Sequence, residues 1–536
     1  MANWFFALSA LAALLLAGVV VLALLLARTR RRGEDAVQPF GQESLQESLA
    51  ALRAELVGTR PCVLQIALDG ADELRQTLRE SARVELLAGV EGLLEEWAAS
   101  LDGLLAKLDE DRFLLLAYTS ALELMIAEKF PILDAVRGYR YRDRREVVTI
   151  SVGVGQGGSF AEAEANSRQA LDMALGRGGD QAAVKHPDLS YAFFGGVSQQ
   201  VEKTGKVQVR TMAMAFAELM RGSDRVYVMG HRNSDLDCLG AAAGVCALAR
   251  AQGKPAYIVL DPARTMAGRM MERLREEQSA RFLTPRQAQN DLSARTLLIL
   301  VDTHIAERLE SPALCEQARQ LAIIDHHRRA VNYIQNAVVF YHDPGVSSAS
   351  ELVTELIQYT TPAPQLSPTE ADALLAGIHL DTRGFVLHAG AAAFTAAAFL
   401  RGQGADTVRV RKLFAGGQED YRRRMEIVSG AEIAGRCAVS AVRGEGAEDP
   451  NRLRLLCSQA ADELLNLEGV DAAFVLFEDG GQIHVSARSL GAVNVQVLME
   501  RLGGGGHQTM AAAQLDGAQE TLDSAEAKIW TVLEER

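Results

Sequence analysis

Residues 226–237 read VYVMGHRNSDLD, an apolar run that gives way to a histidine and two carboxylates. A short apolar run that stops at a glycine is typical of a strand buried in a parallel sheet. His231, Asp235 and Asp237 would then follow the carboxyl end of that strand. Open α/β sheets hold their ligands at this edge. The stretch therefore predicts an α/β fold with a candidate site just beyond the strand.

Three later stretches lead to more side chains of this kind. Residues 297–301 (LLILV) lead to Asp302, residues 321–324 (LAII) lead to Asp-His-His, and a predicted helix over 371–380 leads to Asp381. Alone, each His or Asp would more often be a strand-end cap or a buried polar residue. Converging carboxylates would repel one another and raise each other's pKa, whereas divalent cations remove that repulsion. Mixed His and Asp ligands favour Mn²⁺-like ions, so the four motifs together predict a metal site.

The order of these motifs is His-x-x-x-Asp-x-Asp, a second strand-end Asp, Asp-His-His and a later Asp. It resembles the DHH phosphoesterase superfamily, which includes RecJ-like nucleases, inorganic pyrophosphatases and small-oligonucleotide phosphodiesterases. The resemblance implies two divalent metal ions at a catalytic centre that cleaves phosphoesters. One ion would be bound by His231, Asp235 and Asp302, and the other by Asp237, Asp302, His326 and Asp381. Asp325 and His327 would support these ligands or face the substrate.

The C-terminal part predicts a β-hairpin and a glycine-rich substrate site. An Asp-Gly-Gly turn at 479–481 between apolar runs is a strong hairpin signal. Residues 503–507 read GGGGH, and consecutive glycines let backbone N–H groups approach an anion or a base. A glycine run is more often a flexible loop, but this one is predicted to re-enter a helical segment from Met510 onward. This part resembles the DHH-associated substrate domain. The predicted substrate-binding set is His327, Arg383, Arg488, Gly503, Gly504, Gly505, Gly506 and His507.

Residues 61–196 predict a separate α/β unit, with strands at 63–68, 113–117 and 147–154 and a helix over 166–175. The unit resembles a degenerate GGDEF domain. Its motif turn reads DEDRF at 109–113, where the family has Gly-Gly-Asp/Glu-Glu-Phe. Both glycines that would let the backbone approach a nucleotide are missing, so we expect no cyclase activity. Weak nucleotide binding or hydrolysis by this unit is an open alternative.

The N-terminus predicts a membrane anchor. Residues 4–27 are uncharged and almost wholly apolar, and arginines follow at 28 and 30–32. About 20 apolar residues span the hydrocarbon layer of a bilayer. A cleaved signal peptide would carry its cations before the apolar run, whereas cations after it place the remainder of the chain in the cytoplasm. We therefore expect one pass through the cell membrane and a cytoplasmic catalytic body.

The composition of the chain limits the kinds of partner that it is expected to bind. The 536 residues carry a net charge of −14, which disfavours binding of long nucleic acid, because such binding depends on Lys and Arg contacts to phosphates. Six scattered cysteines form no CxxC pair, so they predict neither a zinc site nor a disulfide framework. Any nucleotide substrate should be small and held by local cations.

The predicted order is an anchor with its basic stop (1–32), a linker (33–60), the GGDEF-like unit (61–196), a connecting helix (197–223), the DHH unit (224–400), a linker (401–429) and the DHH-associated unit (430–536). This order resembles the GdpP-type cyclic-di-AMP phosphodiesterases over nearly the whole chain. The resemblance implies hydrolysis of cyclic di-AMP to linear pApA, and a homodimer is expected. The chain departs from that family in having one apparent span and too short a linker for a PAS sensor domain.

Two alternatives to a cyclic-dinucleotide phosphodiesterase fit the same motifs. One is a small-oligoribonucleotide or pAp phosphatase, which the anchor and the GGDEF-like unit disfavour. The other is a catalytically silent membrane nucleotide sensor, which the full set of expected metal ligands disfavours.

Overall fold

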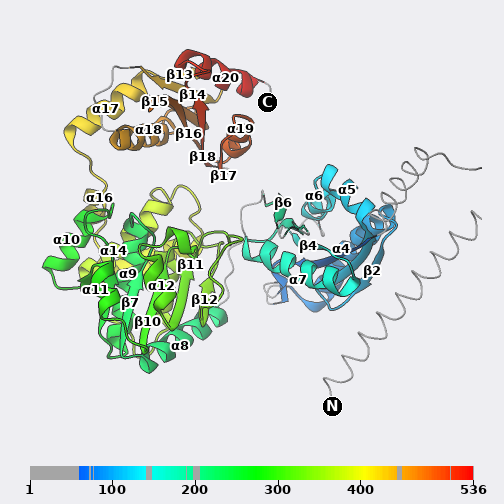
Figure 1. Cartoon of the computed structure of the whole chain (residues 1–536), viewed down its shortest axis with the longest axis horizontal. Helices are drawn as coiled ribbons and strands as arrows, with labels where there is room; N and C mark the ends of the chain where they lie inside the picture. Colours follow the sequence, from blue (N-terminus) through cyan, green and yellow to red (C-terminus); the bar gives the residue numbers. More distant parts are fainter. Residues whose placement is uncertain are drawn as a thin grey trace, which may run out of the picture. The chain divides into compact units, whose positions relative to one another are not determined.

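The computed structural model describes residues 60–71, 74–75, 78–140, 148–186, 188, 190–196, 206–443, 450–507 and 509–534. The predicted anchor at 4–27 and nearly all of the predicted linker at 33–60 lie outside these residues. Within them, no helix combines the length and the apolar composition that crossing a bilayer requires. The described residues include three six-stranded sheets, each the centre of one α/β unit (Figure 1).

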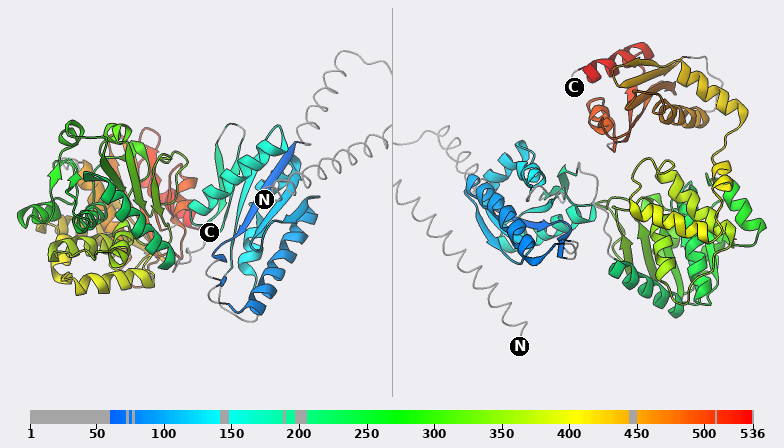
Figure 2. Two further views of the ribbon diagram at one scale, coloured as in Figure 1. Left: turned by 90° about the horizontal axis from the view of Figure 1, so that it is seen from below. Right: turned by 180° about the vertical axis from the view of Figure 1, so that it is seen from behind.

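The first unit is a mixed sheet in the order β2-β3-β1-β4-β5-β6. Its strands are β1 (Pro61–Leu68), β2 (Leu104–Lys107), β3 (Arg112–Tyr118), β4 (Ile150–Gln156), β5 (Gln181–Lys185) and β6 (Tyr191–Gly195). Its helices are α4 (Glu80–Ser100), α5 (Thr119–Ala127), α6 (Pro131–Gly138) and α7 (Phe160–Gly176). Figure 2 shows this sheet with its helices from two further sides.

The two faces of this first sheet bury different partners. Alternate residues of the central strands, such as Leu64 and Val152, enter an apolar core with α4, α5 and α6. Helix α7 packs closely on β4, because a Cβ at Gly155 would lie 2.1 Å from the Ala163 carbonyl oxygen. This helix begins at Phe160, earlier than predicted, because the Ser159 side chain caps it by accepting a hydrogen bond from the backbone of the first turn.

The second unit is a parallel sheet in the order β12-β11-β10-β7-β8-β9. Its strands are β7 (Arg225–Met229), β8 (Ala256–Val259), β9 (Phe282–Leu283), β10 (Thr296–Val301), β11 (Gln320–Asp325) and β12 (Val339–His342). The chain passes from β7 outward to β8 and β9, then returns to β10 on the other side of β7. The strand order therefore reverses between β7 and β10, which is the switch point where open sheets bind ligands.

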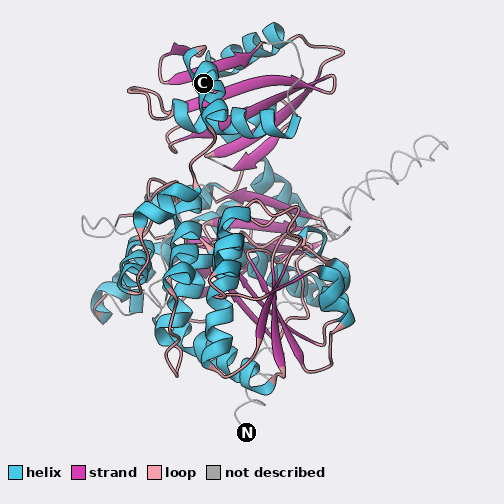
Figure 3. Ribbon diagram, turned by 90° about the vertical axis from the view of Figure 1, so that its left-hand side faces the viewer, coloured by secondary structure: helices cyan, strands magenta, loops and turns pink. Residues whose placement is uncertain are grey.

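Helices cover both faces of this parallel sheet, as Figure 3 shows with strands in magenta and helices in cyan. One core includes residues of α8 (Lys206–Gly222), α9 (Leu236–Ala251), α10 (Gly268–Glu276), α13 (Ala349–Tyr359), α14 (Pro368–Asp381), α15 (Ala391–Gly402) and α16 (Thr407–Leu413). The opposite core includes residues of α11 (Pro285–Asn290) and α12 (Pro312–Gln317). The first core reaches Val410, beyond the predicted end of this unit at residue 400.

The third unit is a mixed sheet in the order β13-β14-β15-β16-β18-β17. Its strands are β13 (Glu432–Ala434), β14 (Cys437–Val442), β15 (Ala472–Asp479), β16 (Gln482–Ser489), β17 (Gly505–His507) and β18 (Met510–Asp516). Helices α17 (Gln418–Ser429) and α18 (Pro450–Leu464) share one apolar core with it, and α19 (Val495–Arg501) and α20 (Leu522–Glu534) share the other.

The structure confirms the hairpin predicted in this third unit. Strands β15 and β16 pair antiparallel down to Asp479 opposite Gln482. The two residues between them, Gly480 and Gly481, have φ of 59° and 75°. Only this left-handed backbone matches the twist of a two-residue hairpin, and glycine adopts it without a steric cost.

The prediction of a helical segment from Met510 onward is wrong, because these residues form strand β18. Each residue from Met510 to Asp516 pairs with β16, and Ala511 and Ala513 enter the apolar core of α19 and α20. Alanine is the best helix former, but helix propensity is weak compared with tertiary context, so ladder hydrogen bonds and burial against the sheet decide the conformation instead.

Candidate metal centre and substrate pocket

Strand β7 delivers the first two predicted ligands. After the strand, Gly230 packs so closely that a Cβ there would lie 1.9 Å from Cys238 Sγ. His231 follows, and its Nε2 lies 3.3 Å from Asp302 Oδ2 and 3.7 Å from Asp235 Oδ1. Asp235 is the N-cap of α9, where its Oδ1 accepts hydrogen bonds of 3.0 Å from two backbone amides of the first turn. The capped helix start thus holds Asp235 beside His231.

Asp302 lies at the centre of the cluster. It follows β10 in left-handed backbone, with φ of 59°, and is 4% exposed. Its Oδ1 lies 3.4 Å from His326 Nε2, yet neither atom has a well-aligned hydrogen-bond partner among the described residues. Buried polar atoms are normally hydrogen-bonded, so each such atom requires an explanation such as a missing ion.

The remaining predicted ligands also lie beside His326. Its Nε2 lies 3.3 Å from Asp381 Oδ2 and 3.9 Å from Asp237 Oδ2. Asp381 is the last residue of α14. Asp237 is fully buried, and its two oxygens accept hydrogen bonds of 2.8 Å from the backbone amides of Ala349 and Ser350 at the start of α13.

A buried carboxylate behind the cluster orients two histidines. Asp325 Oδ2 makes a short contact with His304 Nδ1, and Asp325 Oδ1 lies 2.8 Å from His327 Nδ1. The His304 Nε2 accepts a hydrogen bond from the Ala330 backbone, which fixes its ring from both sides. The sequence gives His304 no recognisable role, because only the tertiary fold places it against Asp325.

The protonation behaviour of the cluster reflects its dense negative charge. Burial lowers the pKa of His231, but hydrogen bonding to Asp235 and Asp302 outweighs it and raises the pKa to about 11. His326 behaves alike, because the carboxylates of Asp302 and Asp381 raise its pKa well above the usual range despite burial. For Asp237, burial and the neighbouring carboxylates raise the pKa well above the usual range. Protons therefore supply part of the positive charge that this cluster requires.

The donor set fits divalent metal ions. Three groups of side chains each bring their ligand atoms within 4.8 Å of one another: His231 with Cys238 and Asp302, Asp302 with His326 and His327, and Asp237 with His326 and Asp381. Asp302 and His326 each belong to two of these groups. Asp235 belongs to none of them, and Cys238, which the sequence did not single out, belongs to one. Imidazole and carboxylate donors together suit Mn²⁺-like ions.

The third unit contains a pocket of about 390 Å³. It is lined by Arg454, Ser458, Phe477, His484, Val485, Ser486, Arg488, Gly505, Gly506, Met510, Ala511, Ala512, Ala513 and Gln514. Of the predicted substrate-binding residues, Arg488, Gly505 and Gly506 are therefore brought together. The predicted His327 and Arg383 belong to the second unit, where Arg383 follows Asp381 by two residues with φ of 47°.

The glycine run has a structural role in the sheet of the third unit. It forms edge strand β17 against β18, with Gly505 opposite Ala512 and His507 opposite Met510. A Cβ at Gly504 would lie 2.2 Å from the Ala512 carbonyl oxygen, and Gly506 has φ of 148°. The backbone of β17 can reach this edge only without side chains at these positions. Gly503 also has positive φ, at 76°.

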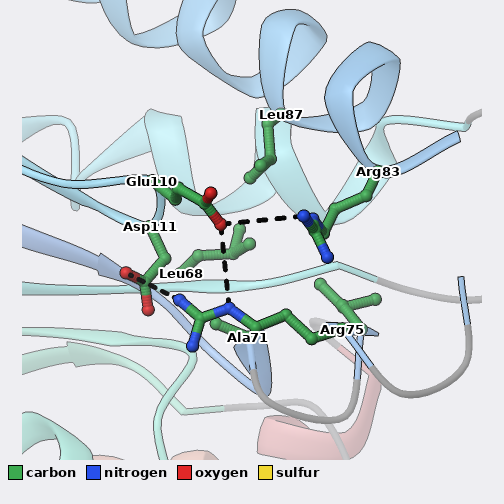
Figure 4. Close-up of a pocket in the computed structure, with 8 residues that line it drawn as sticks. Leu68, Ala71, Arg75, Arg83, Leu87, Glu110 and Asp111 are labelled. Carbon is green, nitrogen blue, oxygen red and sulfur yellow. Dashed lines mark ion pairs between the residues drawn. The ribbon is translucent and has the colours of Figure 1, made fainter. Parts of the chain in front are cut away.

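In the first unit, the turn that departs from the GGDEF motif faces arginines (Figure 4). Glu110, between β2 and β3, lies 3.8 Å from Arg75 and 4.0 Å from Arg83 of α4, and Asp111 lies 3.7 Å from Arg75. These acidic side chains thus lie within ion-pair distance of cations from the same unit. The expected lack of cyclase activity stays a prediction.

Each of the three units matches the model of a known protein domain family. Residues 66–192 match the GGDEF domain of the cyclic-di-AMP phosphodiesterase GdpP-like family. Residues 225–378 match the N-terminal domain of the DHH family, and residues 435–535 match the DHHA1 domain.

Whole-chain comparisons agree with these matches. The chain is 40% identical over 469 residues to "Cyclic-di-AMP phosphodiesterase GdpP" of Geobacillus thermodenitrificans, covering 87% of this chain and 70% of that protein. It is 37% identical to the Bacillus subtilis protein of the same name, covering 85% and 70%. It is 35% identical to "Cyclic-di-AMP phosphodiesterase PdeA" of Listeria monocytogenes, covering 88% and 71%. The chain therefore belongs to the family of GdpP-type cyclic-di-AMP phosphodiesterases.

Proposed function

We propose that this chain hydrolyses cyclic di-AMP to linear pApA at the cluster around Asp302, with two divalent metal ions, Mn²⁺ foremost. The observation that carries the proposal is the pair of buried, unpartnered atoms Asp302 Oδ1 and His326 Nε2, which among the described residues lack a well-aligned hydrogen bond. They lie at the sheet's switch point among further His and Asp donors. The family relationship supports cyclic di-AMP as the substrate.

The side chains would divide into two ligand sets. We propose His231, Asp235 and Asp302 for one ion, and Asp237, Asp302, His326 and Asp381 for the other. When bound, a pair of such ions lowers the pKa of a water molecule and neutralises phosphate charge, which supplies a nucleophile near neutral pH. The capping of α9 by Asp235 and the anchoring of Asp237 by α13 keep the ligand carboxylates in place during turnover.

His327 would act on the substrate. Its Nδ1 lies 2.8 Å from Asp325, so the ring is oriented by that carboxylate, and its side chain is 46% exposed. The ring's Nε2 can then donate a hydrogen bond to a phosphate oxygen and protonate the 3′ oxygen that leaves phosphorus. Arg383, Arg488 and the glycines of β17 would bind the rest of the dinucleotide through its phosphates.

Two further features of the proposal concern location and assembly. We place the chain at the cell membrane through residues 4–27, with its three described units in the cytoplasm, because an apolar run followed by arginines predicts that orientation. We expect a homodimer. Fractionation of cell membranes and light scattering of the detergent-solubilised chain test these two statements.

A substrate comparison tests the activity. The full-length chain with Mn²⁺ should convert cyclic di-AMP to pApA, as followed by chromatography, in parallel with cyclic di-GMP, pApA and pAp. Turnover of pApA and pAp without the cyclic compounds would instead identify a small-oligoribonucleotide phosphatase. Binding of cyclic di-AMP without turnover of any compound would identify a silent sensor.

A substitution tests the metal centre. Asp302→Ala removes a carboxylate that lies beside both His231 and His326, so activity should fall by at least about 1,000-fold, as expected when a shared electrostatic anchor is lost. Asp523 is a carboxylate on the surface of α20 that is 78% exposed. Asp523→Ala is therefore the matched control and should retain the wild-type rate. Near-normal rates in Asp302→Ala would contradict the assignment.

A further inference from the structure

The register of the strands in the third unit arranges the residues on one side of its pocket in rows. Phe477, His484 and Gln514 lie directly opposite one another on β15, β16 and β18. Two residues along, Ser486 lies opposite Ala512, which in turn lies opposite Gly505. Because side chains two residues apart share one face of a strand, these rows line the same side of the sheet.

The rows differ in chemistry. Where the row of Ser486 lines the pocket, it consists of a serine, an alanine and a glycine, so it leaves room for a flat ring above the sheet. The next row contains Arg488, whose guanidinium donates hydrogen bonds to Ser486 Oγ at 3.2 Å and to the Ala487 carbonyl at 3.0 Å. Arg488 lies four residues from His484 along β16, which is about 14 Å in an antiparallel strand. A nucleotide whose phosphate meets Arg488 can therefore extend its base toward His484.

His484 is held rigidly at that end of the pocket. Its ring stacks on Phe477, with centroids 5.1 Å apart and planes inclined by 14°. Burial lowers the pKa of His484, and the nearby Arg454 lowers it further, which favours the neutral imidazole. The backbone of Asp479 interacts with the ring in a way that favours an N–H on the nitrogen beside it. A neutral imidazole has one donor and one acceptor nitrogen, so the second nitrogen is an acceptor.

We propose that His484 selects adenine in this pocket, because its acceptor nitrogen receives a hydrogen bond from the 6-amino group of the base. Adenine presents an amino donor at position 6, whereas guanine and hypoxanthine present a carbonyl oxygen there. A 6-oxo purine would place its carbonyl oxygen, which is an acceptor, against the acceptor nitrogen of His484 in a largely buried site. The inference rests on the proposed function for the identity of the ligand, and it names the residue that distinguishes the base.

The test compares two substrates that differ at this group. Cyclic di-IMP replaces the 6-amino groups of cyclic di-AMP by carbonyl oxygens. With the full-length chain and Mn²⁺, kcat/KM should favour cyclic di-AMP over cyclic di-IMP by at least about tenfold, because an unpaired buried acceptor costs about 1–3 kcal/mol. In His484→Phe, which keeps a ring to stack on Phe477 but has no nitrogen, this ratio should fall to within about threefold of unity.

Two further variants separate recognition from structure. His484→Asn keeps an acceptor and should show a ratio above that of His484→Phe. His186→Phe, the same substitution in the first unit, should keep the wild-type ratio. If His484→Phe slows both substrates equally and leaves the ratio unchanged, His484 only supports the fold and the inference is overturned.

A binding experiment keeps this inference distinct from the proposed function. If the wild-type chain hydrolyses neither dinucleotide, the proposed function fails, and affinities measured by calorimetry with the Asp302→Ala chain still test His484. That chain should bind cyclic di-AMP at least about tenfold more tightly than cyclic di-IMP, and the added His484→Phe change should remove the difference. Equal affinities of the Asp302→Ala chain for the two ligands would overturn the inference.

Discussion

At the scale of single residues, the proposed metal centre depends on backbone and protonation states that are unfavourable elsewhere. Asp302 adopts φ of 59°, a conformation that costs a non-glycine residue about 1–2 kcal/mol. Such strain persists only where the surroundings impose it, and it clusters at functional sites. Here the strain turns the carboxylate toward His231 and His326 directly beyond β10. The pKa of Asp302 is lowered to about 2, since contacts with His231 and His326 outweigh its burial.

Metal binding should release protons from these residues. In the metal-free chain the pKa of His231 is raised to about 11 and that of His326 lies well above its usual range, so both carry protons at pH 7. A cation must displace protons from ligand atoms before it binds. The affinity for Mn²⁺ should therefore increase as the pH rises from 6 to 8. Calorimetry in two buffers of different ionisation enthalpy should show net proton release, and an affinity that is independent of pH would contradict this assignment.

At the scale of elements, helix starts hold the carboxylates of the site. Asp235 caps α9, and Asp237 accepts hydrogen bonds from Ala349 and Ser350 at the start of α13. Both helix ends present unpaired N–H groups and a partial positive charge, which stabilise a carboxylate there. The position of Asp237 therefore depends on how closely α9, α13 and α14 pack, and glycines permit that packing.

Adding one methyl group between these helices should disturb the site. A Cβ at Gly377 of α14 would lie 2.2 Å from Ser350 Oγ and 2.7 Å from Asp237 Oδ1. Gly377→Ala should lower the free energy of unfolding by about 1–3 kcal/mol, as overpacking does, and weaken Mn²⁺ binding because Asp237 must move. Chemical denaturation and metal titration measure the two effects.

Gly402→Ala is the matched control for that substitution. Gly402 is the last residue of α15, and a Cβ there would meet nothing within 4 Å. The free energy of unfolding of Gly402→Ala should rise by less than about 1 kcal/mol, because alanine restricts the unfolded chain more than glycine does. If both variants bind Mn²⁺ as the wild type does, the packing of α14 does not position Asp237.

At the scale of the whole molecule, each of the three units buries its own apolar core, and the His and Asp residues proposed as metal ligands lie outside the apolar side chains of these cores. We therefore expect the described units to fold without the ions. Catalysis does require them, because the proposed site concentrates negative charge that only cations compensate.

Chelation should accordingly separate activity from folding. Treatment with EDTA should abolish turnover while the far-ultraviolet circular dichroism spectrum stays unchanged. The melting temperature of the second unit should fall by several degrees, because a ligand that binds only the folded state stabilises it. Addition of Mn²⁺ should restore both quantities, and a loss of helical signal on chelation would show that the ions are structural.

The sequence alone determined the α/β class, the strands that lead to the proposed ligands and the β15–β16 hairpin. These features are local, since an apolar run followed by His231 or Asp302 marks a strand end whatever surrounds it. Parallel strands place their carboxyl ends at one edge, so their side chains could be expected to meet. Gly480 and Gly481 likewise favour the hairpin turn by their own backbone freedom, whatever surrounds them.

Only the tertiary structure decided the features that depend on distant partners. The alanines after Met510 form a strand because β16 supplies their hydrogen bonds, and Asp325 orients His304 because β10 and β11 are neighbours. His484 lies in the pocket of the third unit, where Phe477 and Gln514 flank it from other strands. Side-chain roles of this kind arise from contacts between residues far apart in the chain, and neither composition nor periodicity encodes which partners will meet.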